Sequence, residues 1–399
     1  MIAHRGTLGR IALLTSLYFA QGLPFGIFSQ ALPVIMRREG QSLEHIGLTN
    51  LLALPWVLKF AWAPMIDRIA GPRRRVILPL NLAAAGLLLG LALVSPGSMV
   101  PLLVTVFLCN LVAATQDIAT DGLAVETLPP EERGLGNGVQ VAGYRLGMVL
   151  GGGVLVLLFD AWGWFASFAS AAAAIALVTL PIVLLPASPR PPVGDRGTSS
   201  QALRWDRWFA GAGGPAWFGL LVVYKLGDSL GTGMVKPMLV DQGLTLAEIG
   251  ALVGLWGSVA GLVGALIGGW VVSRTSRRGA LFAFSLVQLP TLAAYGWIAH
   301  AGPDLIVPVV IAEHLASGMA TAALFTAMMD ACRPGCAGSD YTVQASVVVL
   351  AQGLAATFSG YSAANLGYEG HFGLAVALAV VPILVVARMA RGEGRFRLA

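Results

Sequence analysis

Charged residues are scarce in this chain. Only 11% of its 399 residues are Asp, Glu, Lys or Arg, whereas 56% are hydrophobic. A bilayer core takes roughly 20 apolar residues per helix, so twelve spans would use about 240 positions. The loops left between them are too short to hold a separate soluble domain. The composition therefore predicts an all-α membrane protein that crosses the bilayer many times.

Cysteine is also rare, and the motifs of common enzymes are missing. Cys332 and Cys336 share a predicted cytoplasmic loop, where disulfides are rare and where C-x-x-x-C spacing alone is a weak metal signal. The chain has no H-E-x-x-H motif and no G-x-x-x-x-G-K phosphate loop. Gly227–Gly231 matches the G-x-S-x-G motif of hydrolases, but it lies inside a predicted membrane helix. We expect no metal site, no cofactor and no enzyme activity.

The arginines gather in clusters that alternate with the apolar stretches. Nineteen of the 22 arginines fall before the first stretch, after the last one or in every second gap, and the opposite gaps hold only Arg37 and Arg38. By the positive-inside rule, this bias places both termini in the cytoplasm. The pI of about 9.4 then describes loops beside lipid headgroups rather than a nucleic-acid surface, and we expect no nucleic-acid partner.

An even number of spans is needed to keep both termini on one side. Twelve transmembrane helices satisfy this condition, and the apolar stretches between the arginine clusters supply them. The predicted spans are roughly 11–36, 44–66, 76–95, 99–126, 138–158, 164–186, 214–239, 246–272, 280–299, 304–330, 341–363 and 372–388.

The chain carries an internal repeat. Gly40–Gly47 matches Gly243–Gly250 in its first Gly, its Leu and its final Ile-Gly positions, and the stretch between the sixth and seventh spans is rich in Pro, Gly, Ser and Arg without apolar periodicity. We therefore expect two related six-helix bundles, at 1–187 and 211–399, joined by a cytoplasmic linker at 188–210.

Ionisable groups within spans cost roughly 2.5–3.5 kcal/mol on insertion scales, so each is a functional candidate. In the fourth span, Asn110, Asp117 and Asp121 share one helical face. Arg145 in the fifth span lies at a similar depth. Asp117 is therefore either a proton-coupling carboxylate that responds to a basic partner or half of a permanent ion pair; we favour proton coupling.

The seventh span bears a polar stripe. Lys225, Ser229, Thr232 and Lys236 recur at steps of four, three and four, and Asp228 lies one turn from Lys225. Lys225 could contact an anionic substrate, or it could form a self-satisfied pair with Asp228. Lys236 could simply extend to the membrane interface.

The tenth span contains Glu313 and His314. A histidine beside a glutamate in a low-dielectric site suits proton transfer near neutral pH. Adjacent residues point about 100° apart on a helix, so we expect only one of the two to face a central cavity. Both are candidates for proton coupling, and we expect one or the other to serve.

A third group of charges lies near the predicted cytoplasmic ends of the spans, and we predict that it forms a gate held by ion pairs. Asp121 ends the fourth span near Arg68, and Asp330 ends the tenth span near Arg274. The predicted gate residues are Asp67, Arg68, Asp121, Arg274 and Asp330.

Four segments resemble a known family. They are Tyr18–Gly26, Leu54–Arg68, Gln116–Glu126 and Arg133–Arg145. Their sequences resemble those of the branch of the major facilitator superfamily that includes muropeptide permeases, acetyl-coenzyme A transporters and bacterial siderophore permeases. The Gly-Leu-Pro-Phe-Gly segment and the last of the four look most like the rhizobactin and pyochelin permease group.

The resemblance implies a bacterial inner-membrane permease that works by alternating access. It implies import of a siderophore, with its iron, by proton symport through a monomer, and a muropeptide permease of cell-wall recycling is the alternative. An intramembrane enzyme or a non-transporting sensor would be more distant explanations. On this basis Gln21, Trp56, Arg145 and Lys225 are predicted substrate contacts, and Asp117, Glu313 and His314 are predicted to couple protons.

Overall fold

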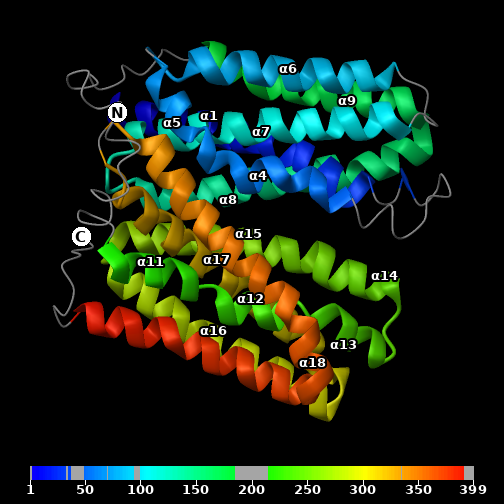
Figure 1. Cartoon of the computed structure of the whole chain (residues 1–399), viewed down its shortest axis with the longest axis vertical. Helices are drawn as coiled ribbons and strands as arrows, with labels where there is room; N and C mark the ends of the chain where they lie inside the picture. The colour runs from blue at the N-terminus through cyan, green and yellow to red at the C-terminus, as the bar shows by residue number, and fades with distance from the viewer. Residues whose placement is uncertain are drawn as a thin grey trace. The chain divides into compact units, whose positions relative to one another are not determined.

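A computed structural model describes residues 2–32, 35–36, 49–69, 71–93, 99–184, 214–333 and 335–390, and this part of the chain is helical with turns between the helices (Figure 1). The predicted linker at 188–210 lies outside the described residues, as do Arg37 and Arg38. The orientation of the chain in the membrane therefore stays a prediction from the arginine pattern.

Eight stretches of the described residues are long and apolar enough to cross a membrane. Two of them are about twice the required length, and each turns back at a glycine with positive φ, Gly163 at 77° and Gly367 at 67°. Each of these two stretches therefore consists of two helices. The eight stretches are Leu8–Ala31, Arg74–Ala92, Met99–Thr127, Arg133–Leu184, Gly250–Arg274, Arg277–Ala301, Pro303–Asp330 and Ala337–Met389.

The second and seventh predicted spans are broken into short helices. The span at 44–66 starts outside the described residues, and its described part is split at helix starts that carry Pro55 and Pro64. The span at 214–239 is interrupted at Lys225 and Met234, whose φ angles are −112° and −108°. Neither has one helix of full membrane length, so a total of twelve helices stays a prediction.

The chain forms two compact units by contact, and each draws on both halves of the sequence. Unit 1 comprises Met1–Leu128, Val139–Leu203 and Pro334–Thr342, and unit 2 comprises Pro129–Gly138, Arg204–Arg333 and Val343–Ala399. The start of α8 (Arg133–Val149) thus belongs to unit 2, and the start of α18 (Ala337–Ala390) belongs to unit 1.

Unit 1 is built around packed long helices. Its core joins Leu88 and Leu91 of α6 to Trp164 and Phe168 of α9, and the Trp164 indole donates to the Leu91 carbonyl at 2.8 Å. Helices α6, α7 and α9 run side by side (Figure 1). The unit contains α1 (Ile2–Gly26), η1 (Ile27–Ala31), η2 (Thr49–Ala53), α4 (Leu54–Leu58), η3 (Lys59–Ala61), α5 (Ala63–Arg68), α6 (Arg74–Ala92), α7 (Met99–Thr127), most of α8, η4 (Leu150–Val154) and α9 (Leu155–Leu184).

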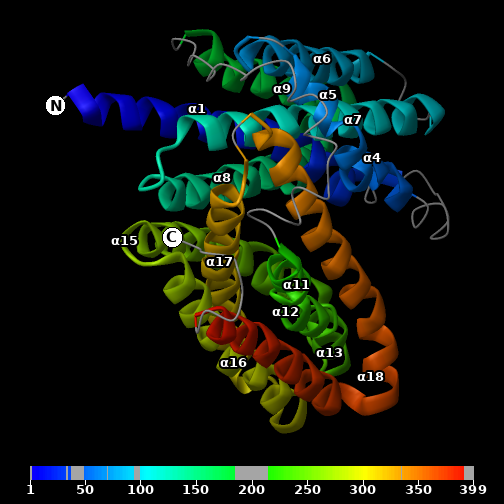
Figure 2. The same cartoon turned by 60° about the vertical axis from the view of Figure 1, so that its left-hand side comes forward.

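Helices α15 and α17 of unit 2 pack against each other and lie side by side in Figure 2. A Cβ added to Gly318 of α17 would lie 2.8 Å from the backbone nitrogen of Ala265 on α15. The unit contains α11 (Gly214–Val223), α12 (Leu226–Thr232), α13 (Val235–Asp241), α14 (Leu246–Ile249), η6 (Gly250–Trp256), α15 (Gly257–Arg274), α16 (Arg277–Ala301), η7 (Pro303–Leu305), α17 (Ile306–Asp330) and most of α18.

Gly318→Ala is expected to destabilise the protein by about 1–3 kcal/mol, because an added methyl group must push two packed backbones apart. Gly373→Ala is the matched control, since a Cβ there meets nothing within 4 Å. That control should be neutral or stabilising by up to about 1 kcal/mol through helix propensity. Thermal unfolding of the two detergent-purified variants measures the difference, and equal midpoints would contradict it.

Candidate functional site

A buried ion pair joins Lys59 of η3 to Asp117 of α7. The two side chains are only 8% and 10% exposed. The sequence places Asp117 at the depth of Arg145, but its ion-pair partner in the structure is Lys59, and Arg145 is half-buried on α8. One sequence feature could have indicated Lys59 as the partner of Asp117: it is one of only three lysines, all of them inside apolar stretches.

Asp121 lies one turn from Asp117 on the same face of α7 and is also buried. The Tyr18 hydroxyl donates to Asp121 at 2.9 Å, and the Gln140 amide nitrogen lies 3.4 Å from the same oxygen and 3.4 Å from the Tyr341 hydroxyl. The sequence predicts Asp121 as a gate residue beside Arg68, which is exposed on α5. The hydrogen bonds of Asp121 join it instead to the surroundings of Asp117.

Three aromatic side chains pack against one another beside this ion pair, and we call Phe25, Trp56 and Tyr144 the aromatic box. The ring centroids of Phe25 lie 5.7 Å from Trp56 and 5.8 Å from Tyr144. The Trp56 indole donates to the Asn110 side chain at 3.2 Å, and Lys59 Nζ lies 5.5 Å from the Trp56 ring centroid. All three box residues are partly exposed, whereas Asn110 is fully buried.

Two buried glutamines have no hydrogen-bond partner within the part of the chain that the structure describes. Gln21 is 1% exposed and Gln116 is 2% exposed, and neither amide oxygen nor amide nitrogen is bonded in either side chain. On α1, Gln21 lies three residues after Tyr18 and four before Phe25, which places it on the face that bears the Asp121 contact and the aromatic box. Unsatisfied buried amides are costly, so a bound polar molecule would stabilise them.

Unit 2 has a polar cluster of its own around the break in the seventh predicted span. Lys225 Nζ lies 2.5 Å from Asp228 Oδ2, and Ser317 of α17 accepts from Lys225 at 2.9 Å and donates to Asp228 at 3.0 Å. The i,i+3 pair that the sequence offers for Lys225 therefore forms, with Ser317 as a third member. Lys236 is exposed on α13.

Glu313 extends this cluster. Its side chain is 2% exposed, it forms a hydrogen bond with Asp228, and its Oε2 lies 2.8 Å from His314 Nδ1. Two neighbouring carboxyl groups repel when both are ionised, so this pair favours a shared proton. His314 Nδ1 also lies 2.9 Å from the Val310 carbonyl oxygen, which favours a proton on that nitrogen.

A first arginine cluster in unit 1 consists of Asp67, Arg73, Glu126 and Ser339. Arg73 donates to Asp67 at 2.6 Å and to Glu126 at 2.8 Å, and its side chain is 1% exposed. The Ser339 backbone N–H and hydroxyl donate to Asp67 Oδ2 at 2.7 and 2.5 Å. Burial alone would lower the pKa of Arg73, but the two carboxylates raise it above its usual value. Asp67 thus has Arg73 as an ion-pair partner.

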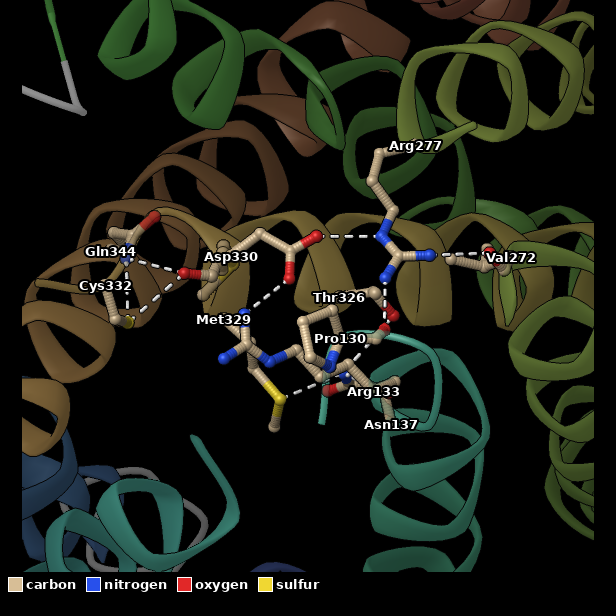
Figure 3. Close-up of polar contacts among 11 residues, drawn as sticks. Pro130, Arg133, Asn137, Val272, Arg277, Thr326, Met329, Asp330, Cys332 and Gln344 are labelled. Carbon is tan, nitrogen blue, oxygen red and sulfur yellow. Dashed lines mark hydrogen bonds and ion pairs between the residues drawn. The ribbon is translucent and has the colours of Figure 1, made fainter. Parts of the chain in front are cut away.

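A second arginine cluster in unit 2 consists of Arg133, Arg277 and Asp330 (Figure 3). Asp330 accepts from Arg133 at 2.7 Å and from Arg277 at 2.8 Å. The sequence predicts Arg274 beside Asp330; in the structure Asp330 forms its ion pairs with Arg133 and Arg277, and exposed Arg274 lies over the Trp270 ring with its Cζ 4.5 Å from the centroid. Helix α15 ends at Arg274 and α16 starts at Arg277, so the two side chains leave the turn in different directions.

Backbone carbonyls complete the second cluster. Arg277 donates to the Val272 carbonyl at 2.7 Å and to the Pro130 carbonyl at 2.5 Å (Figure 3). Asn137 lies next to it and donates to Thr326 Oγ1 at 3.2 Å. The start of α8 is therefore tied to the turn between α15 and α16 and to the end of α17.

The two arginine clusters repeat one ion pair. Arg73 and Glu126 are 53 residues apart in the sequence, and so are Arg277 and Asp330. The surplus charge is opposite, because the first cluster has one arginine for two carboxylates and the second has two arginines for one. This shared spacing supports the internal repeat that the sequence predicts.

Comparison with known proteins agrees with this geometry. A family model described as the Major Facilitator Superfamily matches residues 14–356. The chain belongs to the Major Facilitator Superfamily. It is a multi-pass membrane transporter and not an enzyme. Among curated proteins it is 30% identical over 401 aligned residues to the Anhydromuropeptide permease of Escherichia coli strain K12, covering 94% of this chain and 79% of that protein.

Two solved structures show the same fold. The human organic anion transporter MFSD10 (TETRAN) matches with a TM-score of 0.70 at 15% identity, covering 95% of this chain and 99% of that one. FucP, crystallised in the outward conformation, matches with a TM-score of 0.68 at 15% identity, covering 96% and 99%. At this level of identity these structures speak for the major facilitator fold alone.

Proposed function

We propose that this transporter imports anhydromuropeptides across the bacterial inner membrane by proton symport. The observation that carries the proposal is the similarity to the E. coli permease, which runs along 94% of the chain. The siderophore hypothesis drawn from the sequence motifs finds no support in these relatives, whereas its stated alternative does.

The buried polar clusters suit such a substrate. A muropeptide combines an amino sugar with a peptide that bears carboxyl groups, and a polar ligand of this kind needs cations, amides and aromatic faces. Lys59, Gln21 and Trp56 supply these groups in unit 1, and Lys225 supplies a cation in unit 2. Of the predicted substrate contacts, Arg145 is placed on α8 beside Tyr144 of the aromatic box.

Proton coupling needs buried carboxyl groups that can change partners. Asp117 forms an ion pair with Lys59. Glu313 forms a hydrogen bond with Asp228 and lies beside His314. When a transporter changes state, a carboxylate that loses its cation in a low-dielectric site takes up a proton. We assign coupling to Asp117 and Glu313, with His314 as the neighbour that holds Glu313 in place. The two arginine clusters act as ion-paired gate locks. A single chain contains all the parts needed for transport.

Uptake into proteoliposomes that contain the purified protein tests the proposal. The substrates are a radiolabelled anhydromuropeptide and, in parallel, radioiron-loaded pyochelin-type and rhizobactin-type siderophores, each with an imposed proton gradient and with a protonophore. We expect protonophore-sensitive accumulation of the muropeptide alone. Accumulation of a siderophore without the muropeptide would overturn the proposal in favour of iron uptake.

A further inference from the structure

The Lys59–Asp117 pair has a feature that a simple structural pair lacks. Two carboxylates, Asp117 and Asp121, lie one turn apart on α7, and Lys59 forms its ion pair with Asp117. Asp121 is held by the neutral groups of Tyr18 and Gln140. A pair that only joins two helices would need one carboxylate, so the second one calls for a different explanation.

The groups around the pair have the chemistry that a sugar-peptide ligand needs. The aromatic box is partly exposed directly beside a buried lysine, and Lys59 Nζ lies 5.5 Å from the Trp56 ring. Gln21 points from the same face of α1 with both amide atoms unbonded at 1% exposure. Aromatic rings accept the apolar faces of sugars, and a free amide both donates to and accepts from hydroxyl and acetamido groups.

We propose that Lys59 is a carboxylate-binding residue, and that a carboxylate of the substrate replaces Asp117 at Lys59 Nζ while the amino sugar packs in the aromatic box. This inference rests on the proposed function. The ion pair to Asp117 breaks, the ion pair to the substrate forms, and Asp117 takes one proton from water on the side from which the substrate entered.

Charge counting explains why the exchange carries a proton. A substrate carboxylate would place three carboxyl groups around the ammonium of Lys59, together with Asp117 and Asp121, which are both buried. Neighbouring carboxylates in such a site cannot all stay ionised, so binding requires a proton. The other titratable groups near these carboxylates are the hydroxyls of Tyr18, Tyr144 and Tyr341. Substrate and proton would then enter together.

Binding of two chemically matched ligands tests the exchange. The probes are an anhydromuropeptide with free peptide carboxyl groups and the same molecule with those groups converted to carboxamides. Calorimetric binding to the detergent-purified protein at several pH values gives affinity and proton uptake. The variants are Lys59→Gln, Asp117→Asn and the double variant, with Lys236→Gln as a control that removes an exposed lysine.

We expect wild-type protein to bind the free acid about ten- to a hundredfold more tightly than the carboxamide, as for a charge-assisted contact. Lys59→Gln should remove this preference, Asp117→Asn should keep it but lose the proton uptake on binding, and Lys236→Gln should behave like the wild type. The ligand comparison needs no mutation, and the double variant, which removes both members of the buried ion pair, keeps the test open if a single variant fails to fold.

Three outcomes separate the inference from the proposed function. Equal wild-type affinity for the two probes would overturn the exchange and leave muropeptide transport standing. A preference for the free acid that survives in Lys59→Gln would place the carboxylate elsewhere and also overturn it. Failure of the wild type to bind either probe would contradict the proposed function itself.

Discussion

Arg73→Met is expected to cost about 3–5 kcal/mol of stability, the typical effect of removing one partner from a buried ion pair. The Arg73 side chain is 1% exposed and holds Asp67 and Glu126, whose side chains are 4% and 10% exposed. Without the guanidinium, two carboxylates remain buried together. The measurement is the thermal unfolding midpoint of the detergent-purified protein, with the amount of protein recovered from membranes as a second readout.

The neighbouring Arg74 supplies a matched control. It is exposed at the first residue of α6, so Arg74→Met removes the same charge from the same helix end and should change stability by at most about 0.5 kcal/mol. Neutralising the carboxylates in the triple variant Arg73→Met, Asp67→Asn, Glu126→Gln should recover part of the loss. If Arg73→Met and Arg74→Met unfold at the same temperature, the first arginine cluster does not stabilise the protein.

Glu313→Gln is expected to lower muropeptide accumulation in proteoliposomes to the level seen with a protonophore. The amide keeps the shape of the side chain and can still hydrogen-bond to Asp228, but it cannot carry a proton. Counterflow between labelled and unlabelled substrate needs no net proton movement, so it should continue. The comparison of accumulation with counterflow separates loss of coupling from loss of binding.

Glu369→Gln is the control for this substitution. Glu369 pairs with His300 at the surface, where its side chain is 63% exposed, so the same chemical change should leave accumulation unaffected. Undiminished accumulation in Glu313→Gln would remove Glu313 from the coupling mechanism and leave Asp117 as the remaining carboxylate candidate.

The helical architecture could be predicted from charge spacing alone, but the breaks in two helices could not. Arginine clusters lie in every second gap between the predicted spans, and each of the eight long stretches of the structure has at least one end at or near such a cluster. The second and seventh spans have similar apolar content. Even so, the second span is split at Pro55 and Pro64, and the seventh span is interrupted at Lys225. Hydropathy averages over such breaks, because one non-helical residue barely changes the composition of a window.

The broken second helix also explains the missed partner of Asp117. Depth in the membrane can be counted at about 1.5 Å per residue only where a helix is regular. Lys59 lies in a short 3₁₀ segment between α4 and α5, where this count does not apply. Counting depth by residue number therefore pointed to Arg145, on the regular helix α8, as the partner of Asp117.

The sequence also could not predict which of several neighbouring arginines forms each buried ion pair. Each arginine-rich turn offers several side chains, and a shift of one residue rotates a helical position by about 100°. Arg73 directly precedes α6 and Arg277 begins α16, and these two point inward, whereas Arg274 at the end of α15 stays at the surface. The residue at which each helix starts determines which arginine points inward. Sequence patterns place helix ends only to within a few residues.

Unit 1 includes Pro334–Thr342, and this has a consequence for how the chain is made. Asp67 receives two hydrogen bonds from Ser339, which leaves the ribosome 272 residues later. At about 5–20 residues per second, the early helices wait for this segment on the order of tens of seconds. Pro129–Gly138 waits in the same way for Arg277 and Asp330 in unit 2. Neither unit can be finished on its own during synthesis, so the two are completed almost together, near the end of translation.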